Sequence, residues 1–246
     1  MEIPFFQIIN FILILVVLII FIRYIWDLSH DSGYQPASWQ EAKKQKRISS
    51  NLRRLERNYP DKVRFFSWWI MVERLKKENV PGDFAELGVY KGESARILHQ
   101  MDPGRKFHLF DTFEGFPVRD LSRETGEAAT YTSINFADTS VSKVLQKVDG
   151  NQNIVVHKGY FPDTTSGMED NRFAMVNMDC DLYNPTKAGL EFFYPRLSPG
   201  GFILVHDYNL KWEGIVRAVD EFVQKIPDSY FILPDMEGTA VIIKGK

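Results

Sequence analysis

The sequence predicts an α/β domain with a mainly parallel sheet, preceded by an apolar helix long enough to cross a membrane. From residue 61 onward, short apolar runs of strand type alternate with segments of helical periodicity. Such alternation is typical of a parallel sheet with helices on both faces. Acidic residues follow several of the predicted strands, and residues 3–22 contain no charge. We therefore expect a ligand site at one edge of the sheet and an anchor at the N-terminus.

Length and composition restrict the class of protein further. The chain has 246 residues, a formal net charge of −2 and 44% apolar residues. This size fits one medium domain with an appendage. The net charge gives no indication of a nucleic-acid partner, and the single cysteine, Cys180, excludes an intramolecular disulfide. We divide the chain into a transmembrane anchor (1–22), a basic juxtamembrane linker or helix (23–60) and a folded domain (61–246).

The first segment has the length and composition of a membrane span. About 20 apolar residues make a helix that crosses a bilayer. A cleaved signal peptide is one alternative, but no basic residue precedes the run and no small-x-small pattern follows it. A buried core helix is the other alternative. Tyr24 and Trp26 suit the aromatic belt at a membrane interface, so we favour the anchor.

The second segment is basic. Residues 23–60 contain eight Lys or Arg and four Asp or Glu, a net charge of +4. By the positive-inside tendency, this predicts a single-pass protein with its folded domain in the cytoplasm. Ile48, Leu52, Leu55 and Tyr59 form an apolar stripe at helical spacing. Two interpretations stay open: the helix lies on anionic lipid, or it packs its stripe on the folded domain.

The elements of the domain follow in order. Asp61 is a candidate cap for a helix that runs to about Asn79 and ends before Pro81-Gly82. We expect its buried face to contain Val63, Phe66, Trp69 and Ile70. Trp68-Trp69 is more typical of a core than of a substrate contact.

Seven strands and three further helices complete the prediction. The strands are expected at 84–87, 106–110, 153–157, 173–178, 201–205, 230–233 and 239–243, the last two as a hairpin around a Pro-Asp-Met-Glu-Gly turn. The helices are expected at 93–100, at 141–148 after a run of capping residues, and around 215–223, where the apolar spacing is strongest.

A glycine-rich turn follows the first strand and opens a helix, in Glu86-Leu87-Gly88-Val89-Tyr90-Lys91-Gly92. It lacks the third glycine of the dinucleotide fingerprint and the Gly-Lys-Ser/Thr of a phosphate loop, so a pyrophosphate ligand is poorly supported. Asp111 lies 23 residues after Gly88, near the spacing of about 20 at which a carboxylate meets ribose hydroxyls. We therefore predict a nucleotide-type cofactor at Glu86, Gly88, Gly92 and Asp111. The alternative is that the glycines only form turns and Asp111 only caps a loop.

A second set of polar residues follows two later strands. Asp179 and Asp181 come after strand 173–178, and His206 and Asp207 come after strand 201–205. Carboxylates at one edge of a parallel sheet predict a divalent metal beside the cofactor. His206 is an unusual Mg²⁺ ligand, since imidazole suits zinc or iron, and it is also a candidate base. Asp181 is a candidate base as well, or a cap for the following helix.

These motifs resemble class I S-adenosylmethionine-dependent methyltransferases, and most of all the macrocin O-methyltransferase group. The resemblance covers about residues 63–246 and also includes Phe110-Asp111-Thr112-Phe113-Glu114-Gly115-Phe116-Pro117, Lys158-Gly159-Tyr160-Phe161-Pro162-Asp163-Thr164 and Leu197-Ser198-Pro199-Gly200-Gly201. It implies that residues 61–246 form a methyltransferase domain with a seven-stranded Rossmann-like sheet. It also implies S-adenosylmethionine as methyl donor and Mg²⁺, or another divalent metal, that orients a sugar hydroxyl.

The resemblance also implies roles for single residues. Glu86 and Gly88 would lie near the methionine part, Asp111 would hold the ribose, Gly159 and Tyr160 would lie near the adenine, and Asp179 and Asp207 would bind the metal. The chain departs from the family at one position: the family usually has two adjacent acids where this chain has His206-Asp207.

The expected reaction is an in-line methyl transfer to a hydroxyl of a sugar, glycolipid or natural product, with His206 or Asp181 as base. The expected acceptor is a small molecule or a lipid-linked glycan at the membrane, and the sequence does not distinguish a monomer from a homo-oligomer. Two alternatives stay open: a nicotinamide-dependent oxidoreductase, which the missing glycine disfavours, and a membrane-tethered binding protein with a decayed site.

Overall fold

The computed structural model describes residues 4–30, 35–122, 124–150 and 152–245, without the side chains of residues 26–30. The chain divides into two compact units, Met1–Gln45 and Lys46–Lys246. The second unit includes residues 61–246, for which we predicted the folded domain, and the predicted boundary at Asp61 stays a prediction. Each unit is described by itself below.

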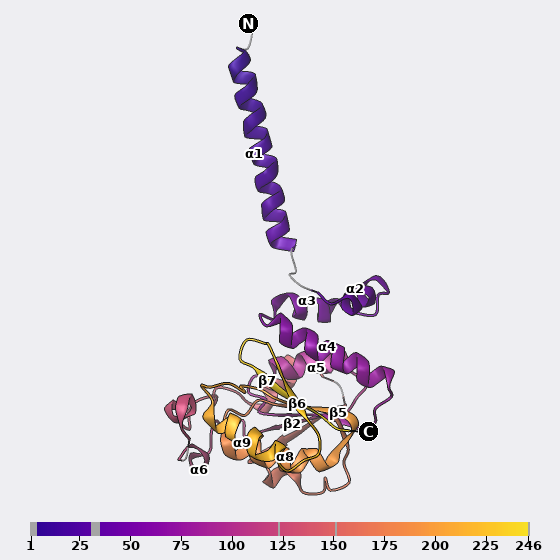
Figure 1. The fold of residues 1–246 in the computed structure, drawn as a ribbon, viewed down its shortest axis with the longest axis vertical. Coiled ribbons are helices and arrows are strands. Elements are labelled where there is room, and N and C mark those ends of the chain that lie inside the picture. Colours follow the sequence, from indigo (N-terminus) through magenta and orange to yellow (C-terminus); the bar gives the residue numbers. More distant parts are fainter. Residues whose placement is uncertain (1–3, 31–34, 123, 151, 246) are drawn as a thin grey trace. The chain divides into compact units, whose positions relative to one another are not determined.

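The N-terminal unit contains two helices, α1 (Phe5–His30) and α2 (Ala37–Lys44) (Figure 1). The 21-residue stretch Phe5–Ile25 of α1 is predominantly apolar, with Arg23 as its one charged residue, it is long enough to cross a membrane, and all of its residues are exposed. Length and composition of this kind also occur in signal sequences, so membrane insertion stays a prediction. The helix continues beyond the predicted end at residue 22, and the side chain of Trp26 lies outside the described residues.

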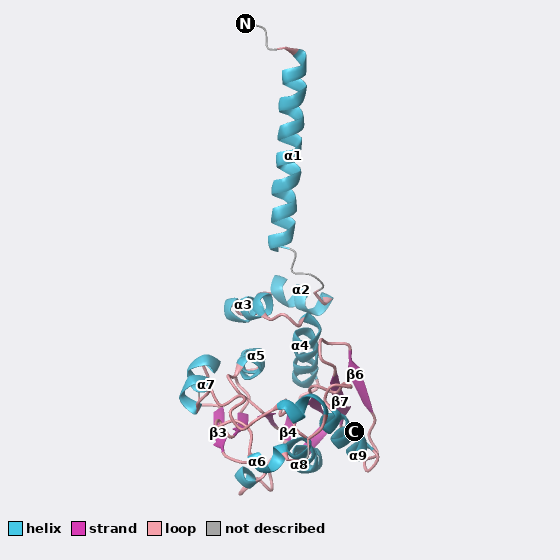
Figure 2. Cartoon of the chain, turned by 90° about the vertical axis from the view of Figure 1, so that its left-hand side faces the viewer, coloured by secondary structure: helices cyan, strands magenta, loops and turns pink. Residues whose placement is uncertain are grey.

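The second unit is built on a sheet of seven strands in the order β3-β2-β1-β4-β5-β7-β6 (Figure 2). The strands are β1 (Asp83–Leu87), β2 (Phe107–Asp111), β3 (Ile154–Lys158), β4 (Phe173–Met178), β5 (Leu197–Val205), β6 (Tyr230–Leu233) and β7 (Thr239–Ile243). β1 to β5 pair in parallel, and β7 is antiparallel to both β5 and β6. The predicted strands and the final hairpin are therefore confirmed. The strand order reverses between β1 and β4, which is where ligands bind in sheets of this type.

Helices cover both faces of the sheet (Figure 1). The helices on one side are α4 (Lys62–Lys77), α5 (Glu93–Met101) and α7 (Val141–Val148), and those on the other are α8 (Tyr183–Phe193) and α9 (Glu213–Val223). The predicted caps form: Asp61 Oδ1 accepts the Arg64 amide of α4 at 2.9 Å, and Ser140 Oγ accepts the Lys143 amide of α7. The short helix α6 (Val118–Leu121) and the 3₁₀ turn η1 (Gly126–Thr130) lie in the long connection after β2; two more 3₁₀ turns are η2 (Asp163–Thr165) and η3 (Tyr194–Arg196).

The predicted apolar stripe of Ile48, Leu52, Leu55 and Tyr59 lies partly on helix α3 (Ser50–Asn58). Ile48, Leu52 and Leu55 are only 4%, 2% and 4% exposed, and α3 packs on α5. Of the two interpretations of this stripe, the structure supports packing on the folded domain, because buried side chains are not free to enter lipid.

The predicted buried face of α4 is partly wrong. Phe66 and Trp69 are buried, but Val63 and Ile70 are 41% and 50% exposed. A second stripe at the same spacing is buried, and it consists of Phe65, Trp68, Val72 and Leu75. The sequence offers two apolar stripes on α4, each with one Phe and one Trp, and both aromatic pairs are buried, whereas of the aliphatic residues only Val72 and Leu75 are buried.

Candidate active site

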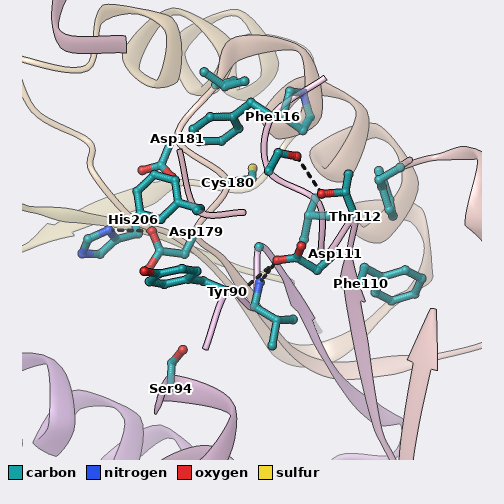
Figure 3. A pocket seen from close by; sticks show the side chains of 18 of the residues that line it. Tyr90, Ser94, Phe110, Asp111, Thr112, Phe116, Asp179, Cys180, Asp181 and His206 are labelled. Carbon is teal, nitrogen blue, oxygen red and sulfur yellow. Dashed lines mark hydrogen bonds and ion pairs between the residues drawn. The ribbon is translucent and has the colours of Figure 1, made fainter. Parts of the chain in front are cut away.

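A cavity of about 500 Å³ opens at the carboxyl ends of the five parallel strands (Figure 3). The lining residues that follow these strands, in sheet order, are His206 and Asp207 (β5), Asp179 (β4), Gly88 (β1), Asp111 (β2) and Gly159 (β3). With neighbouring strands about 4.8 Å apart, the five strand ends span about 19 Å. The structure thus joins the predicted cofactor residues and the predicted metal residues in one cavity.

The Asp111 carboxylate holds the glycine-rich turn in place. Its Oδ2 accepts the amides of Val89 and Tyr90 at 2.7 and 2.8 Å, and its Oδ1 accepts the amide of Phe113 at 2.6 Å. A carboxylate has about four acceptor positions, so room remains for about one ligand hydroxyl. Asp111 therefore caps the loop, as the alternative interpretation predicted, and it also lines the cavity, as a cofactor-binding residue would.

The two glycines of the turn have different surroundings. Both have positive φ angles, 86° at Gly88 and 75° at Gly92, which favour glycine. A Cβ atom on Gly88 would overlap the carbonyl of Asp179, so the turn after β1 lies directly against the turn after β4. Gly92 caps α5 next to Val144, and only Gly88 of the two lines the cavity. Close packing against Val144 therefore accounts for the glycine at position 92. Gly92 does not line the cavity in which we expect the cofactor.

Glu86 lies beneath the cavity and does not line it. It is fully buried; one oxygen accepts hydrogen bonds from Ser94 Oγ and from Asn177 Nδ2, the latter at 3.0 Å. Its other oxygen, Oε2, has no hydrogen-bond partner among the described residues. Burial raises the pKa of Glu86 to about 8, although the bonds from Ser94 and Asn177 oppose this. Ser94, which the sequence analysis missed, lines the cavity above it.

Tyr160 lines the cavity after β3, as expected. Its hydroxyl donates to Asp120 Oδ1 at 3.0 Å, and the Arg119 guanidinium lies 3.3 Å from the centre of its ring. Asp120, in α6, also lines the cavity and is 2% exposed. We did not predict Asp120, because nothing in the sequence distinguishes it from the other acids in the loop after β2.

The predicted metal residues converge at the other end of the cavity. Nδ1 of His206 lies 2.9 Å from Asp179 Oδ1 and 2.9 Å from Asp207 Oδ1, and one ligand atom from each residue lies within 4.8 Å of the others. Neither ring nitrogen of His206 makes a well-directed hydrogen bond with the described residues. Figure 3 shows His206 and Asp179 side by side, with Asp181 close to them.

The charges of Asp179, His206 and Asp207 depend on one another. Burial disfavours a charged His206, but the carboxylates of Asp179 and Asp207 outweigh it and raise its pKa to about 10. Burial likewise disfavours a charged Asp179, but His206 and Arg64 hold its pKa below the usual range. Without a metal, His206 is therefore protonated at neutral pH and is a poor base.

Asp181, the other candidate base, also lines the cavity. Burial, and then the charges of Asp179 and Asp207, raise the pKa of Asp181 well above its usual value. It does not cap α8, because the Tyr183 amide donates to Glu124 Oε1 at 2.8 Å. Asp181 and Asp207 have φ angles of 59° and 61°, a left-handed conformation that is uncommon outside glycine and often found at functional sites.

Cys180, between the two acids, has the surroundings of a packed residue and not those of an activated nucleophile. Its thiol lies 3.3 Å from the Thr186 hydroxyl, and burial raises its pKa. A high thiol pKa keeps the reactive thiolate scarce.

Aromatic residues cover the cavity from the loop after β2. Phe116 and Phe136 line it, and Phe136 lies edge-on to the ring of Tyr90 at 4.9 Å. Tyr131 stacks on Phe116 at 5.2 Å, and burial and nearby carboxylates, Asp181 first among them, raise its pKa. We infer that this side of the cavity is suited to flat or apolar ligand surfaces.

Tyr59, before α4, and Arg64, in the first turn of α4, are two residues that the sequence analysis did not assign to the site. Tyr59 lines the cavity, and burial raises its pKa to about 12. Arg64 is 9% exposed and donates to Asp235 in the β6–β7 turn at 3.0 Å, which fixes it near Tyr59 and Asp179. The only signal for Tyr59 was its place at the end of the stripe that begins at Ile48.

Comparison with solved structures defines the class of protein first. The O-methyltransferase NovP superposes with a TM-score of 0.65 at 26% identity, over 75% of this chain and 81% of that chain. The calicheamicin methyltransferase CalS11 has a TM-score of 0.59 at 23% identity, over 87% and 95% of the two chains. The fold of the second unit is therefore the methyltransferase fold, built on the seven-stranded mixed sheet described above.

Sequence comparison then gives the family. The Macrocin-O-methyltransferase (TylF) family profile matches residues 30–233. A tetracenomycin rhamnosyl 4'-O-methyltransferase of Streptomyces olivaceus is 30% identical over 150 residues, which are 56% of this chain and 57% of that protein. Mycinamicin III 3''-O-methyltransferase of Micromonospora griseorubida is 33% identical over 150 residues, 56% of this chain and 59% of that protein. The chain belongs to the macrocin O-methyltransferase family, although it matches less than two thirds of the length of these two relatives.

Proposed function

We propose that the protein is an S-adenosylmethionine-dependent O-methyltransferase that acts on a hydroxyl of a sugar or sugar-bearing molecule. One observation supports this most strongly: a single cavity joins the Gly88–Asp111 region to the group formed by Asp179, His206 and Asp207. A donor at the first position and an acceptor at the second would meet within one enclosed space. Proximity and alignment of this kind provide much of the rate of methyl transfer, because the sulfonium donor is already activated.

Family membership supports the same proposal. By their names, both sequence relatives are O-methyltransferases, and the name of the first includes a rhamnosyl group. The present chain would act on an acceptor of the same general kind. The aromatic side of the cavity, with Phe116 and Phe136, suits the apolar face of a sugar ring or of an attached aglycone.

The residues present fit a divalent metal. Ligand atoms at adjacent corners of an octahedron with bonds of about 2.0–2.1 Å lie about 2.9 Å apart. The two distances from His206 Nδ1, to Asp179 Oδ1 and to Asp207 Oδ1, are both 2.9 Å. Two carboxylates and one imidazole suit manganese, iron or zinc better than magnesium, since imidazole is a softer ligand than an oxygen. We propose that Asp179, His206 and Asp207 hold this ion.

The residues that line the cavity would then have three separate roles: donor binding, cation binding and proton transfer. Asp111 and the backbone at Gly88 hold the donor, and the carboxylates at the other end hold the cation. A bound cation supplies a Lewis acid that orients the acceptor hydroxyl and favours its ionised form. Asp181, which lies in the cavity wall, receives the hydroxyl proton, and a bound cation beside it would favour the ionised form of its carboxyl, the form that accepts a proton.

We further propose that α1 anchors the enzyme in a membrane as a single-pass protein with its catalytic domain in the cytoplasm. The support is the predominantly apolar stretch Phe5–Ile25 and the +4 charge of residues 23–60. Tethering raises the local concentration of enzyme at the membrane, which favours a membrane-associated acceptor such as a lipid-linked glycan.

Calorimetry tests the class of cofactor. Full-length protein in detergent micelles is titrated with S-adenosylhomocysteine and, separately, with NAD⁺. We expect binding of the first and none of the second. Binding of NAD⁺ alone would replace the proposal with a nicotinamide-dependent oxidoreductase.

A further inference from the structure

The outer side of helix α3 presents three arginines to solvent. Leu52 and Leu55 of this helix are buried, whereas Arg53, Arg54 and Arg57 are exposed. Because an α-helix turns by about 100° per residue, the three arginines lie within about 100° of one another, opposite the two buried leucines. These three arginines form the basic face of α3.

The charge of the basic face is not neutralised within the described part of the chain. Glu56 is the one acid of α3, but it is 3% exposed, and its carboxylate lies 3.6 Å from the ammonium group of Lys62. Arg54 donates to the side-chain oxygen of Asn51 at 2.9 Å, and none of the three arginines forms an ion pair with a described residue. The three guanidinium groups can therefore bind an anionic partner outside the chain.

The charge of the second unit is distributed unevenly along the sequence. Residues 46–60 contain five Lys or Arg and one Glu, whereas residues 61–246 have a net charge of −5. An anionic surface attracts the basic face of such a domain and repels the remainder, so it orients the domain. The preferred contact of this domain with an anionic surface is therefore at α3.

The proposed anchor makes a membrane the anionic surface that α3 meets first. Lys46 follows His30, the last residue of α1, by 16 residues, a chain that spans less than about 60 Å even when it is fully extended. When α1 crosses a bilayer, this tether gives α3 a high local concentration at the lipid headgroups. A guanidinium group also fits a lipid phosphate well, since it donates two parallel hydrogen bonds to it.

Helix α3 also ends next to the cavity. Its last residue is Asn58, and the following residue, Tyr59, lines the cavity. Two views show α3 as an outer layer of the second unit, outside α5, on which it packs (Figures 1 and 2). A surface that contacts the basic face is therefore close to the cavity as well.

We propose that the basic face of α3 binds anionic phospholipid headgroups and holds the catalytic domain against the membrane, with the cavity close to the lipid. The inference rests on the proposed function, because it takes the membrane from the proposed anchor. The apolar stripe of α3 packs on the domain while the arginines on its opposite side contact the lipid. A lipid-linked acceptor would then reach the cavity without leaving the membrane.

Energy transfer tests the proposal on the full-length protein in lipid nanodiscs, where α1 inserts whatever the headgroup. A donor fluorophore is attached at Asn58→Cys, after Cys180→Ser has removed the native thiol, and a small fraction of the headgroups has the acceptor fluorophore. The discs contain phosphatidylcholine alone or with about one third phosphatidylglycerol. We expect at least about twofold more energy transfer in the anionic discs. This rise should vanish in 1 M salt, where the Debye length is about 3 Å.

A second label position and two variants are the controls. A donor at Gln224→Cys, at the exposed end of α9 on the other side of the sheet, should show no rise. Replacing the basic face by Arg53→Gln, Arg54→Gln and Arg57→Gln should abolish the rise at residue 58. A second variant, which should keep the rise, removes the same charge from three exposed positions elsewhere in the second unit: Lys106→Gln, Arg172→Gln and Lys225→Gln. Thermal unfolding verifies that each variant is folded.

Several results would overturn the proposal. Equal transfer from residue 58 in both kinds of disc would contradict lipid binding, and binding of a short RNA by wild type alone would then assign the basic face to nucleic acid. A rise that survives the loss of the three arginines would assign it to other basic residues, and a rise lost in both variants would reflect net charge only. If the protein did not enter the discs, the proposed anchor would fail and this inference with it, whereas the proposed methyl transfer would stand.

Discussion

The imidazole of His206 and the carboxylate of Asp179 lie side by side at the ends of neighbouring strands, with Nδ1 2.9 Å from Oδ1. Asp207 approaches the same nitrogen at the same distance. The family usually has two adjacent acids at positions 206 and 207, whereas this chain has an imidazole and one carboxylate. The imidazole would determine which metal ion the site prefers.

The first prediction concerns metal preference. Metal-free full-length protein should bind Mn²⁺ about 100-fold more tightly than Mg²⁺, because the imidazole disfavours the harder ion. His206→Asp should reduce this ratio by about tenfold, mainly through tighter Mg²⁺ binding. Electron paramagnetic resonance of free Mn²⁺, with Mg²⁺ as competitor, measures both constants. His206→Asn, a weaker ligand without a charge, should weaken both ions, and an unchanged ratio in His206→Asp would contradict the ligand role.

The second prediction separates the two roles of Asp111. Asp111→Asn loses one acceptor oxygen near the ribose position and weakens the bonds to the amides of Val89, Tyr90 and Phe113. We expect about tenfold weaker binding of S-adenosylhomocysteine and a loss of about 1–3 kcal/mol in stability. Calorimetry and denaturant unfolding give the two numbers. Asp138→Asn is the control, because Asp138 accepts from Tyr90 Oη on the outer side of the same turn. A variant that is destabilised but binds with wild-type affinity would leave Asp111 only its loop role.

The third prediction concerns Glu86 and pH. Its pKa rises from an ordinary value of 4.5 to about 8 on folding, because the carboxyl is buried. The folded protein therefore holds this proton more tightly than the unfolded chain. The resulting stability is complete below about pH 4.5 and is lost as the pH rises through about 8.

Glu86→Gln removes the titration and keeps an acceptor for Asn177. We expect the melting temperature of the variant to exceed that of wild type by several degrees at pH 8.5, and the difference to vanish near pH 5. Differential scanning calorimetry at both pH values measures it. Glu191→Gln, at an exposed position of α8, should show no such pH dependence. A difference independent of pH would mean that Glu86 does not titrate in this range.

The fourth prediction concerns the anchor. The protein should resist extraction by high salt and by alkaline carbonate, and protease on the cytoplasmic side should digest the catalytic domain. Replacing Leu15 and Leu18 by Arg adds about 2.5–3.5 kcal/mol per residue to insertion and should release the protein. The matched change of both residues to Ala should not. Release of wild type by salt alone would contradict a membrane span, and protection from cytoplasmic protease would reverse the orientation.

Much of the fold followed from the sequence, since each strand is a short apolar run between turn residues. The seven strands and the caps at Asp61 and Ser140 depend on local patterns, so they were predictable. The buried face of α4 was not, because Val63 and Phe65 begin two stripes of equal spacing and only tertiary packing selects one of them. Local pattern determines where an element lies, but not always which side it buries.

The site was predictable where a residue lies at the carboxyl end of a strand or within two residues of it, as Asp111, Asp179 and Asp207 do. It was less predictable where backbone contacts decide the role. Gly92 packs against Val144, and Glu86 lies beneath the cavity, although both belong to the same motif as Gly88. Tyr59 and Asp120 come from segments far from the strand ends, and only the folded chain brings them to the cavity.

The most direct test of the central claim is methyl transfer itself. Membranes that contain the full-length protein are incubated with methyl-labelled S-adenosylmethionine, Mn²⁺, and lipid and aqueous extracts of cells that lack the protein. We predict that label enters an acceptor in one extract, and that Asp179→Asn lowers this to background without weakening the binding of S-adenosylhomocysteine. Protein that binds S-adenosylhomocysteine but labels nothing in either extract would contradict the proposed enzyme and indicate a binding protein.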